Sequence, residues 1–164
     1  MTYIVIFYDI GAEVMHRIGY LVTEGFQVLA LGTQTVFEYA NRVSGADFYT
    51  LGLFSASGGL VSSSLGFAIA TQPLSSAVAT DSWLVTGINN PLLTAADPAI
   101  TAFLRDEALT ARRMVGLCTG GFMLAQAGLL DGRRVTTHWA YTRQLQADYP
   151  GLQVEQDRIF VVDG

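Results

Sequence analysis

One segment constrains the fold of this chain more than any other: VGLCTGGFMLAQAGLLDGRRVTTHW, from Val115 to Trp139, which contains the chain's single cysteine. Apolar residues at 114–117 predict the end of a buried strand, and residues 119–127 predict a helix with one apolar face. Cys118 falls at the junction, where glycines on both sides allow the backbone to turn sharply without a side-chain clash. The pattern therefore predicts a strand–turn–helix elbow.

The predicted elbow sets the sulfur of Cys118 at a helix N-terminus. Unpaired N–H groups and the helix dipole at such a site favour thiolate over thiol. The alternative is a buried cysteine that acts as a small hydrophobic residue, which is common for free thiols. The surrounding glycines and the position at a strand end favour the exposed elbow.

Composition indicates one globular domain inside the cell. Of the 164 residues, 51% are hydrophobic and 14% are charged, which argues against disorder. A single cysteine excludes an intrachain disulfide framework and a cysteine-rich zinc site, and it suits a reducing compartment. No segment has the pattern of a signal peptide, and apolar runs such as Thr2–Tyr8 are too short to cross a membrane. We expect a cytoplasmic protein with no metal, no cofactor and no membrane contact.

The charge distribution bears on nucleic-acid binding. Net charge is −5 and the arginines are scattered, so nothing in the sequence would attract phosphate backbones. We expect that this chain alone does not bind DNA or RNA.

Predicted strands and helices alternate along the chain. Strands are expected at Arg17–Val22, Asp47–Ser55, Ser82–Thr86, Met114–Leu117, Arg134–Thr137 and Arg158–Val162, with a short edge hairpin at Leu60–Ala70. Helices are expected at Gln27–Val43, Pro98–Arg112 (with Asp97 as N-cap), Thr119–Ala127 and Ala140–Tyr149.

This alternation predicts an α/β fold: a doubly wound, mainly parallel sheet with helices on both faces, in a flavodoxin-like three-layer sandwich. Leu29, Val36, Phe37, Ala40 and Val43 would form the apolar side of the first helix. Ligands in this architecture bind beyond the carboxyl ends of the strands, where Glu24, Gly87 and Cys118 should converge.

Several stretches resemble a known family. CTGGFMLAQAGLLDGRRVTTHW resembles the elbow-to-histidine segment of the ThiJ/PfpI superfamily, whose fold is similar to that of class I glutamine amidotransferases. RIGYLVTEGFQVLALGTQTVFEYANRVSG and HWAYTRQLQADYPGLQVEQDRIFVVDG are similar to the amidase-like N-terminal domain of GlxA-type regulators in the AraC family. The resemblance covers residues 17–164.

The resemblance implies roles for particular residues. Cys118 occupies the nucleophile position, and His138 the position of the histidine near that thiol. The backbone N–H groups after Gly87, at Ile88, and at Thr119 occupy oxyanion-hole positions, a set of donors that stabilises developing negative charge. The pocket expected around them is lined by Glu24, Gly87, Ile88, Thr119, Gly120 and Trp139.

Simpler explanations exist for three of these residues. His138 could cap the strand end and hydrogen-bond to backbone, since histidine often does so. Gly87 could be an ordinary turn glycine. Trp139 could favour a cationic head group by cation–π contact, or could belong to the core.

One departure from the enzymes of the superfamily concerns catalysis. Those enzymes place a carboxylate shortly after the first glycine turn, where it hydrogen-bonds to the thiol. Aligned through Gly25, that position is Ala30, which can neither orient a thiol nor shuttle a proton. Glu24 lies one residue before the glycine and could reach the pocket instead, although a glutamate in a turn is usually solvated.

A second departure concerns the extent of the domain. Relatives continue past the Asp-Gly at positions 163–164 into a strand, a helix and a helix-turn-helix domain. We therefore expect residues 17–164 to be a ThiJ/PfpI-like domain that is either a fragment, incomplete at its C-terminus, or a standalone protein with a shortened sheet. It is preceded by an extension at 1–16, in which Tyr3–Tyr8 is either an edge strand or a leader. An uncovered apolar sheet face would favour a homodimer.

Two functions remain open from the sequence. The first is a ligand-sensing domain of a transcription regulator without catalysis, whose effector is a small molecule; the resemblance implies a nitrogenous metabolite. Contact with DNA would then require a domain outside this chain. The second is a cysteine-dependent hydratase, amidase or glyoxalase that uses Cys118 as nucleophile and His138 as acid/base. Ala30 favours the sensor, and the Cys118–His138 pair favours the enzyme.

Overall fold

The structure, a computed structural model, describes residues 15–163 and contains a central sheet of six strands. The strand predicted at 3–8 lies outside the described residues. The strands are β1 (His16–Leu21), β2 (Tyr49–Ser55), β3 (Ser57–Ser62), β4 (Ala68–Pro73), β5 (Ser82–Val85) and β6 (Arg113–Gly116). Their order across the sheet is β3-β4-β2-β1-β5-β6, and β3 alone runs antiparallel to its neighbour. The predicted doubly wound sheet and its edge hairpin are thus confirmed.

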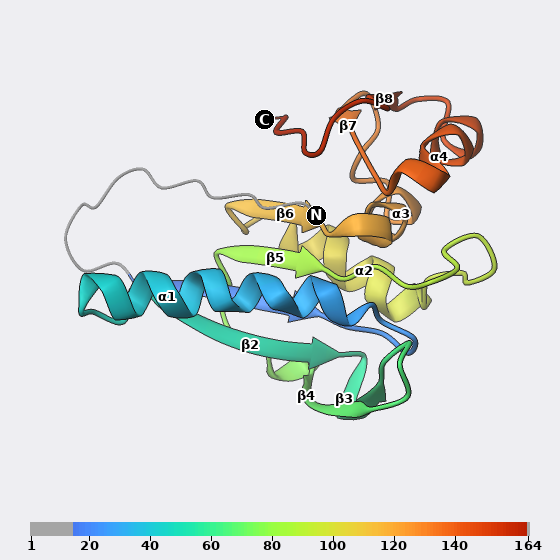
Figure 1. Cartoon of the computed structure of the whole chain (residues 1–164). Coiled ribbons are helices and arrows are strands. Elements are labelled where there is room, and N and C mark those ends of the chain that lie inside the picture. Colours follow the sequence, from blue (N-terminus) through green and yellow to red (C-terminus); the bar gives the residue numbers. More distant parts are fainter. Residues whose placement is uncertain (1–14, 164) are drawn as a thin grey trace.

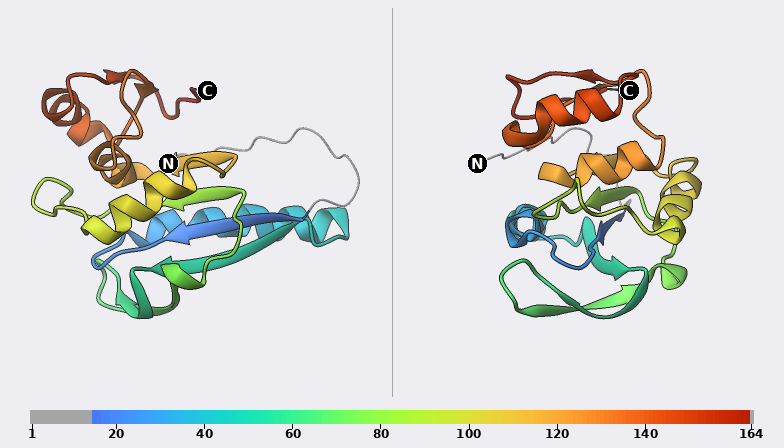
Figure 2. Two further views of the ribbon diagram at one scale, coloured as in Figure 1. Left: turned by 180° about the vertical axis from the view of Figure 1, so that it is seen from behind. Right: turned by 90° about the vertical axis from the view of Figure 1, so that its right-hand side faces the viewer.

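Helices cover both faces of this sheet (Figures 1 and 2). Helix α1 (Gln34–Ser44) lies on one face, and α2 (Pro98–Glu107) and α3 (Gly121–Gln126) lie on the other. Because side chains alternate along a strand, neighbouring residues enter opposite layers. Leu21 and Val85 belong to the core beside α2 and α3, and Tyr20 and Leu84 belong to the core beside α1. The three-layer arrangement follows directly from this alternation.

The start of α2 agrees with the sequence prediction. Asp97 caps the helix, since its Oδ1 accepts a hydrogen bond of 2.8 Å from the N–H of Ala99, and Pro98 occupies the first helical position. The helix ends at Glu107, earlier than the predicted residue 112. Glu107 accepts a 2.7 Å hydrogen bond from the indole N–H of Trp83, a fully buried side chain that would otherwise lack a polar partner.

The first predicted helix, at 27–43, is partly wrong. Residues Val28–Thr33 form a 3₁₀ helix, and the α-helix begins only at Gln34. A 3₁₀ helix has three residues per turn, so the phase of the apolar pattern changes between the two segments. Leu29, in the 3₁₀ segment, is 79% exposed although it was predicted on the packed side. Val43, also predicted there, lies in the last turn of α1 and is 85% exposed.

The C-terminal region forms a separate small unit beyond the β6 edge of the sheet (Figure 1). It comprises β7 (Arg134–Val135), the 3₁₀ turn η4 (Trp139–Tyr141), α4 (Thr142–Asp148) and β8 (Gln153–Val154), and β7 pairs with β8. Its core is shared with α3: Val135, Leu145 and Leu152 of the unit pack with Phe122 and Ala125 of α3.

Of the two strands predicted in this region, one is shorter than expected and the other is not formed. The strand expected at 134–137 is two residues long and does not join the central sheet. The strand expected at 158–162 is wrong, since those residues have no strand structure. Side chains hold the segment instead of a ladder: the Thr136 hydroxyl donates to the carbonyl of Arg158 over 3.1 Å, and the N–H of Arg134 donates to the Asp163 carboxylate over 2.9 Å.

No helix in the described part of the chain is long and apolar enough to cross a membrane.

Candidate functional site

The turn at Cys118 is the elbow that the sequence predicts. Cys118 has a φ of +56°, and no other described non-glycine residue has a positive φ. Such a conformation is costly for an L-residue and persists only where the surrounding structure holds it. A 3₁₀ turn, η3 (Cys118–Gly120), leads directly into α3, and Cys118 is exposed. The alternative of a sealed core cysteine is therefore wrong.

Close backbone approaches explain the glycines around the elbow. A Cβ on Gly87, after β5, would lie 2.7 Å from the nitrogen of Thr119 and 3.0 Å from the carbonyl oxygen of Leu117. A Cβ on Gly116 would lie 2.7 Å from the nitrogen of Gly121. A Cβ on Gly120 would collide with the carbonyl oxygen of Val85. Gly87 is therefore more than a turn glycine, because it lets the loop after β5 contact the elbow.

The ionisation of Cys118 differs from the sequence prediction. Partial burial of the sulfur raises the pKa of Cys118, and a hydrogen bond from the backbone N–H of Thr119 lowers it by less. Desolvation is the larger of the two effects, so the direction of the pKa shift is opposite to the stabilisation of the thiolate that the sequence predicts.

His138 hydrogen-bonds to the backbone, as the simpler of its two predicted roles requires, although it caps a turn and not a strand end. It caps the η4 turn, and its Nδ1 accepts a 3.2 Å hydrogen bond from the N–H of Ala140. Its ring centroid lies 5.3 Å from that of Trp139, which is 79% exposed and so does not belong to the core. The hydroxyl of Thr137 donates to the carbonyl of Cys118 over 3.0 Å, which ties this segment to the elbow.

Positions 24 and 30 were considered for a catalytic carboxylate, and neither places a carboxylate beside the thiol. Ala30 lies buried in the 3₁₀ helix before α1, with 7% of its surface exposed. The Glu24 carboxylate is directed to β3 instead, where its Oε2 accepts a 3.1 Å hydrogen bond from the N–H of Ser62. The proton-handling group of the enzymes is thus missing from the position where the resemblance would place it.

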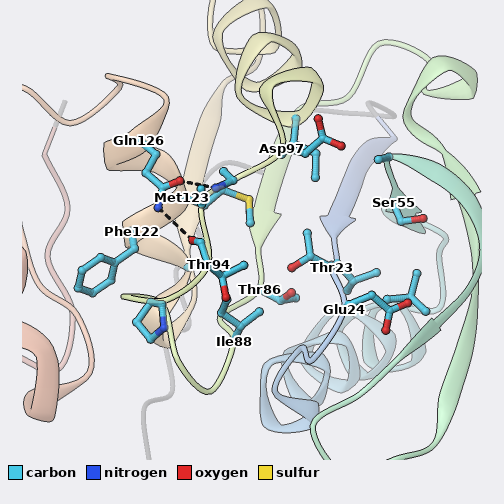
Figure 3. A pocket seen from close by; sticks show the side chains of 18 of the residues that line it. Thr23, Glu24, Ser55, Thr86, Ile88, Thr94, Asp97, Phe122, Met123 and Gln126 are labelled. Atoms are coloured by element: carbon cyan, nitrogen blue, oxygen red, sulfur yellow. Dashed lines mark hydrogen bonds between the residues drawn. The ribbon is translucent and has the colours of Figure 1, made fainter.

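A cavity of about 330 Å³ lies at the carboxyl ends of the strands (Figure 3). Its wall is mainly apolar, with Val22, Leu60, Val61, Ile88, Ile100, Phe122 and Met123, and its polar side chains include Thr23, Glu24, Ser55, Thr86, Thr94, Asp97 and Gln126. Four residues of the predicted site line it, namely Glu24, Ile88, Thr119 and Gly120. Gly87, Cys118, His138 and Trp139 are not among its lining residues.

The sequence analysis missed several residues of this cavity. Ser55 ends β2, Asp97 caps α2, and Met123 and Gln126 lie on α3. Only Asp97 carried a local signal, and that signal was for helix capping. The strand-end rule located the cavity, but it could not show which side chains meet there.

Three side chains form hydrogen bonds to the backbone of the loop between β5 and α2, which forms one wall of the cavity. The Thr119 hydroxyl donates to the carbonyl of Ile88 over 2.7 Å, and the Tyr141 hydroxyl donates to the carbonyl of Asn89 over 2.9 Å. The Gln126 side chain accepts a hydrogen bond from the N–H of Ala96 (Figure 3). The elbow, α3 and the C-terminal unit therefore all position this wall.

Residues 15–163 contain no group of three or more His, Cys, Asp or Glu side chains that could hold a metal ion.

Comparison with protein families places the chain among known proteins. The model of the DJ-1/PfpI family matches residues 11–164. The chain belongs to this family. A protein from Streptomyces lividans, described only as encoded in the cpoL 5′ region, is 40% identical over 137 residues, which cover 82% of this chain and 96% of that protein.

Regulators are also among the relatives. The HTH-type transcriptional regulator CdhR of Pseudomonas aeruginosa is 36% identical over 88% of this chain, and GlxA of Rhizobium meliloti is 31% identical over 92%. This chain spans 43% of CdhR and 47% of GlxA, so it corresponds to less than half of either regulator. The predicted resemblance to GlxA-type regulators is confirmed.

A solved structure shows the same fold. The crystal structure of an AraC family transcriptional regulator from Pseudomonas putida superposes with a TM-score of 0.74 at 22% identity, covering 90% of this chain and 80% of that one. A further relative is an enzyme: isonitrile hydratase of Pseudomonas putida is 54% identical over 39 residues, 24% of this chain and 17% of the hydratase.

Proposed function

We propose that this chain is the small-molecule-sensing domain of a GlxA-type AraC regulator and that it acts without catalysis. Its relatives CdhR and GlxA are transcriptional regulators, and this chain matches less than half the length of each. The regulator would act in the cytoplasm as a homodimer and would contact DNA through a domain outside this chain. The effector would bind in the cavity at the carboxyl ends of the strands.

The main support for this proposal is that Cys118 does not line the cavity. Catalysis by Cys118 would require an ionised sulfur, a proton acceptor and substrate in one place. Here the pKa of Cys118 is raised, the Nδ1 of His138 already accepts a backbone hydrogen bond, and neither residue lines the cavity. A wall of mainly apolar and hydroxyl side chains suits reversible binding.

Two variants of this chain separate sensing from catalysis. Cys118→Ala removes the sulfur, and Ala95→Trp places a bulky ring at the cavity wall. Ala99→Trp is the matched control, because Ala99 is an exposed residue on α2 that does not line the cavity.

The assay is a thermal-shift screen of amines, amides, amino acids and small acids on each variant. The proposal predicts that Cys118→Ala and Ala99→Trp keep the ligand-induced shift, that Ala95→Trp loses it, and that NMR detects no consumption of the ligand. Loss of the shift in Cys118→Ala with full retention in Ala95→Trp would contradict it.

A second candidate function is supported by two observations. The isonitrile hydratase segment is 54% identical, and Cys118 sits exposed on a left-handed elbow, as a nucleophile would. In this function the chain would add water to an isonitrile carbon and release the N-substituted formamide. Incubation with n-butyl isonitrile tests it: formation of N-butylformamide by the wild type, absent in Cys118→Ala, would favour the enzyme over the sensor.

A further inference from the structure

We propose that Tyr141 positions the loop between β5 and α2 and thereby couples the strand-end cavity to the C-terminal unit. This inference rests on the proposed sensing function, since it names the residue through which occupancy of the cavity would change the C-terminal unit. The contact that defines this role joins two residues that lie 52 positions apart in the chain.

The loop between β5 and α2 separates two hollows of the structure. Pro91, Thr94 and Ala95 of this loop line both the strand-end cavity and a second groove of about 580 Å³. Asp148 and Tyr149, at the end of α4, also line that groove. A groove, rather than a layer of packed side chains, therefore lies between the loop and the end of α4.

The two ends of the loop are attached to the elbow and to α3. At the first end, the carbonyl of Ile88 accepts a 2.7 Å hydrogen bond from the Thr119 hydroxyl. At the second end, the Gln126 side chain accepts from the N–H of Ala96 and donates to the carbonyl of Thr94 (Figure 3). These contacts fix where the loop begins and ends, but they do not reach its middle.

The middle of the loop is attached through Asn89. The backbone carbonyl of Asn89 accepts a 2.9 Å hydrogen bond from the Tyr141 hydroxyl, and its side-chain oxygen accepts a longer bond of 3.4 Å from Gln27. Leu92 and Leu93, which follow, are exposed. A segment with few buried contacts opens at a low cost in free energy, so the bond from Tyr141 has a large effect on where this segment lies.

Tyr141 also contacts the cavity wall and α4. Its ring packs edge-on against Phe122, with the ring centroids 6.2 Å apart and an interplanar angle of 84°. Phe122 lines the cavity and belongs to the same core as Leu145 of α4. Tyr141 itself is the residue that immediately precedes α4, so a displacement of Tyr141 acts on the first turn of that helix. One side chain thus connects the loop, the cavity wall and the helix.

This connection makes the cavity and the C-terminal unit thermodynamically linked. A molecule that contacts the loop or Phe122 would change the position that Tyr141 favours. Coupling between two sites is reciprocal, so a change made in the loop must alter α4 by the same free energy as the reverse change. Reciprocity allows the coupling to be tested on this chain without a ligand.

Native-state hydrogen exchange, followed by NMR, measures the coupling. Tyr141→Phe removes the hydroxyl and keeps the ring. It should speed exchange of the α4 amides and of the Ala96 amide about two- to tenfold relative to the amides of β5, the range expected for the net contribution of one hydrogen bond. A tyrosine that stabilised only its own unit would leave Ala96, in the loop, unaffected. Tyr39→Phe is the matched control, since Tyr39 is exposed on α1, and it should change neither rate.

A variant within the loop tests the reverse direction. Pro91→Gly loosens the loop, because glycine frees the backbone angle that proline fixes. It should speed exchange of the α4 amides, and this effect should be at least about threefold smaller when Tyr141→Phe is also present, as a double-mutant cycle requires of coupled residues. If Pro91→Gly does not fold, Leu93→Gly replaces it, because Leu93 is 83% exposed.

Two results would overturn the inference. The first is an effect of the loop variant on α4 that is the same with and without the Tyr141 hydroxyl, or an unchanged rate at Ala96 in Tyr141→Phe. The second is equal acceleration in α4 and in β5, since this would indicate a loss of stability of the whole domain. Neither result bears on sensing itself, which the thermal-shift screen with Ala95→Trp tests independently of Tyr141.

Discussion

Replacement of Gly87 by alanine tests how closely the loop after β5 must approach the elbow. The new Cβ would lie 2.7 Å from the backbone nitrogen of Thr119 and 3.0 Å from the backbone oxygen of Leu117. Ordinary contacts begin near 3.4 Å, so the two backbones must separate by about 0.7 Å. The cost of such overpacking is about 1–3 kcal/mol, because backbone atoms cannot rotate away as a side chain can.

The expected loss of stability is measurable by thermal unfolding. For a chain of this length 1 kcal/mol corresponds to about 2–4 °C in Tm, so Gly87→Ala should lower Tm by roughly 2–12 °C. Gly32→Ala is the matched control, since a Cβ there would meet no atom within 4 Å and the φ of Gly32 is not positive. That variant should change Tm by less than about 2 °C. Equal effects of the two substitutions would refute the argument that Gly87 is required by the elbow.

Three further predictions follow from single contacts. Because burial raises the pKa of Cys118, its alkylation by iodoacetamide should reach half-maximal rate above the ordinary thiol value of about 8.5, and a midpoint below pH 7.5 would contradict this. Glu107→Ala should destabilise the fold by about 1–3 kcal/mol in a denaturant titration, since it leaves the buried Trp83 N–H unpaired, while Asp106→Ala on the exposed surface should have little effect. Asp97→Ala should cost about 1 kcal/mol of unfolding free energy through loss of the helix cap and Asp97→Asn nearly none; equal losses would show that charge, rather than capping, matters there.

The elbow could be predicted from the sequence because its determinants are local. Gly116 and Gly120 lie within two residues of Cys118, where small residues signal a sharp turn. A Cβ on Gly116 would meet the backbone of Gly121 in the same turn, whereas the contact that requires Gly120, with Val85 of β5, is distant in the sequence. The N-cap at Asp97 was equally local, since the carboxylate and its partner at Ala99 are two residues apart.

Features that depend on distant partners could not be predicted. The segment 158–162 has the composition of a strand, yet it forms none, because side-chain bonds from Thr136 and Arg134 hold it in place of a ladder. The cavity is similar in this respect. Ser55 and Met123 meet there from opposite halves of the chain, and neither has a neighbour in the sequence that signals a binding site.

The most direct test of the account is a crystal structure of this chain with the compound that gives the largest thermal shift in the screen. We predict an intact, reversibly bound ligand in the strand-end cavity, in contact with Thr86 and Met123 and without a bond to Cys118. A ligand seated against the sulfur of Cys118, with the cavity empty, would contradict it.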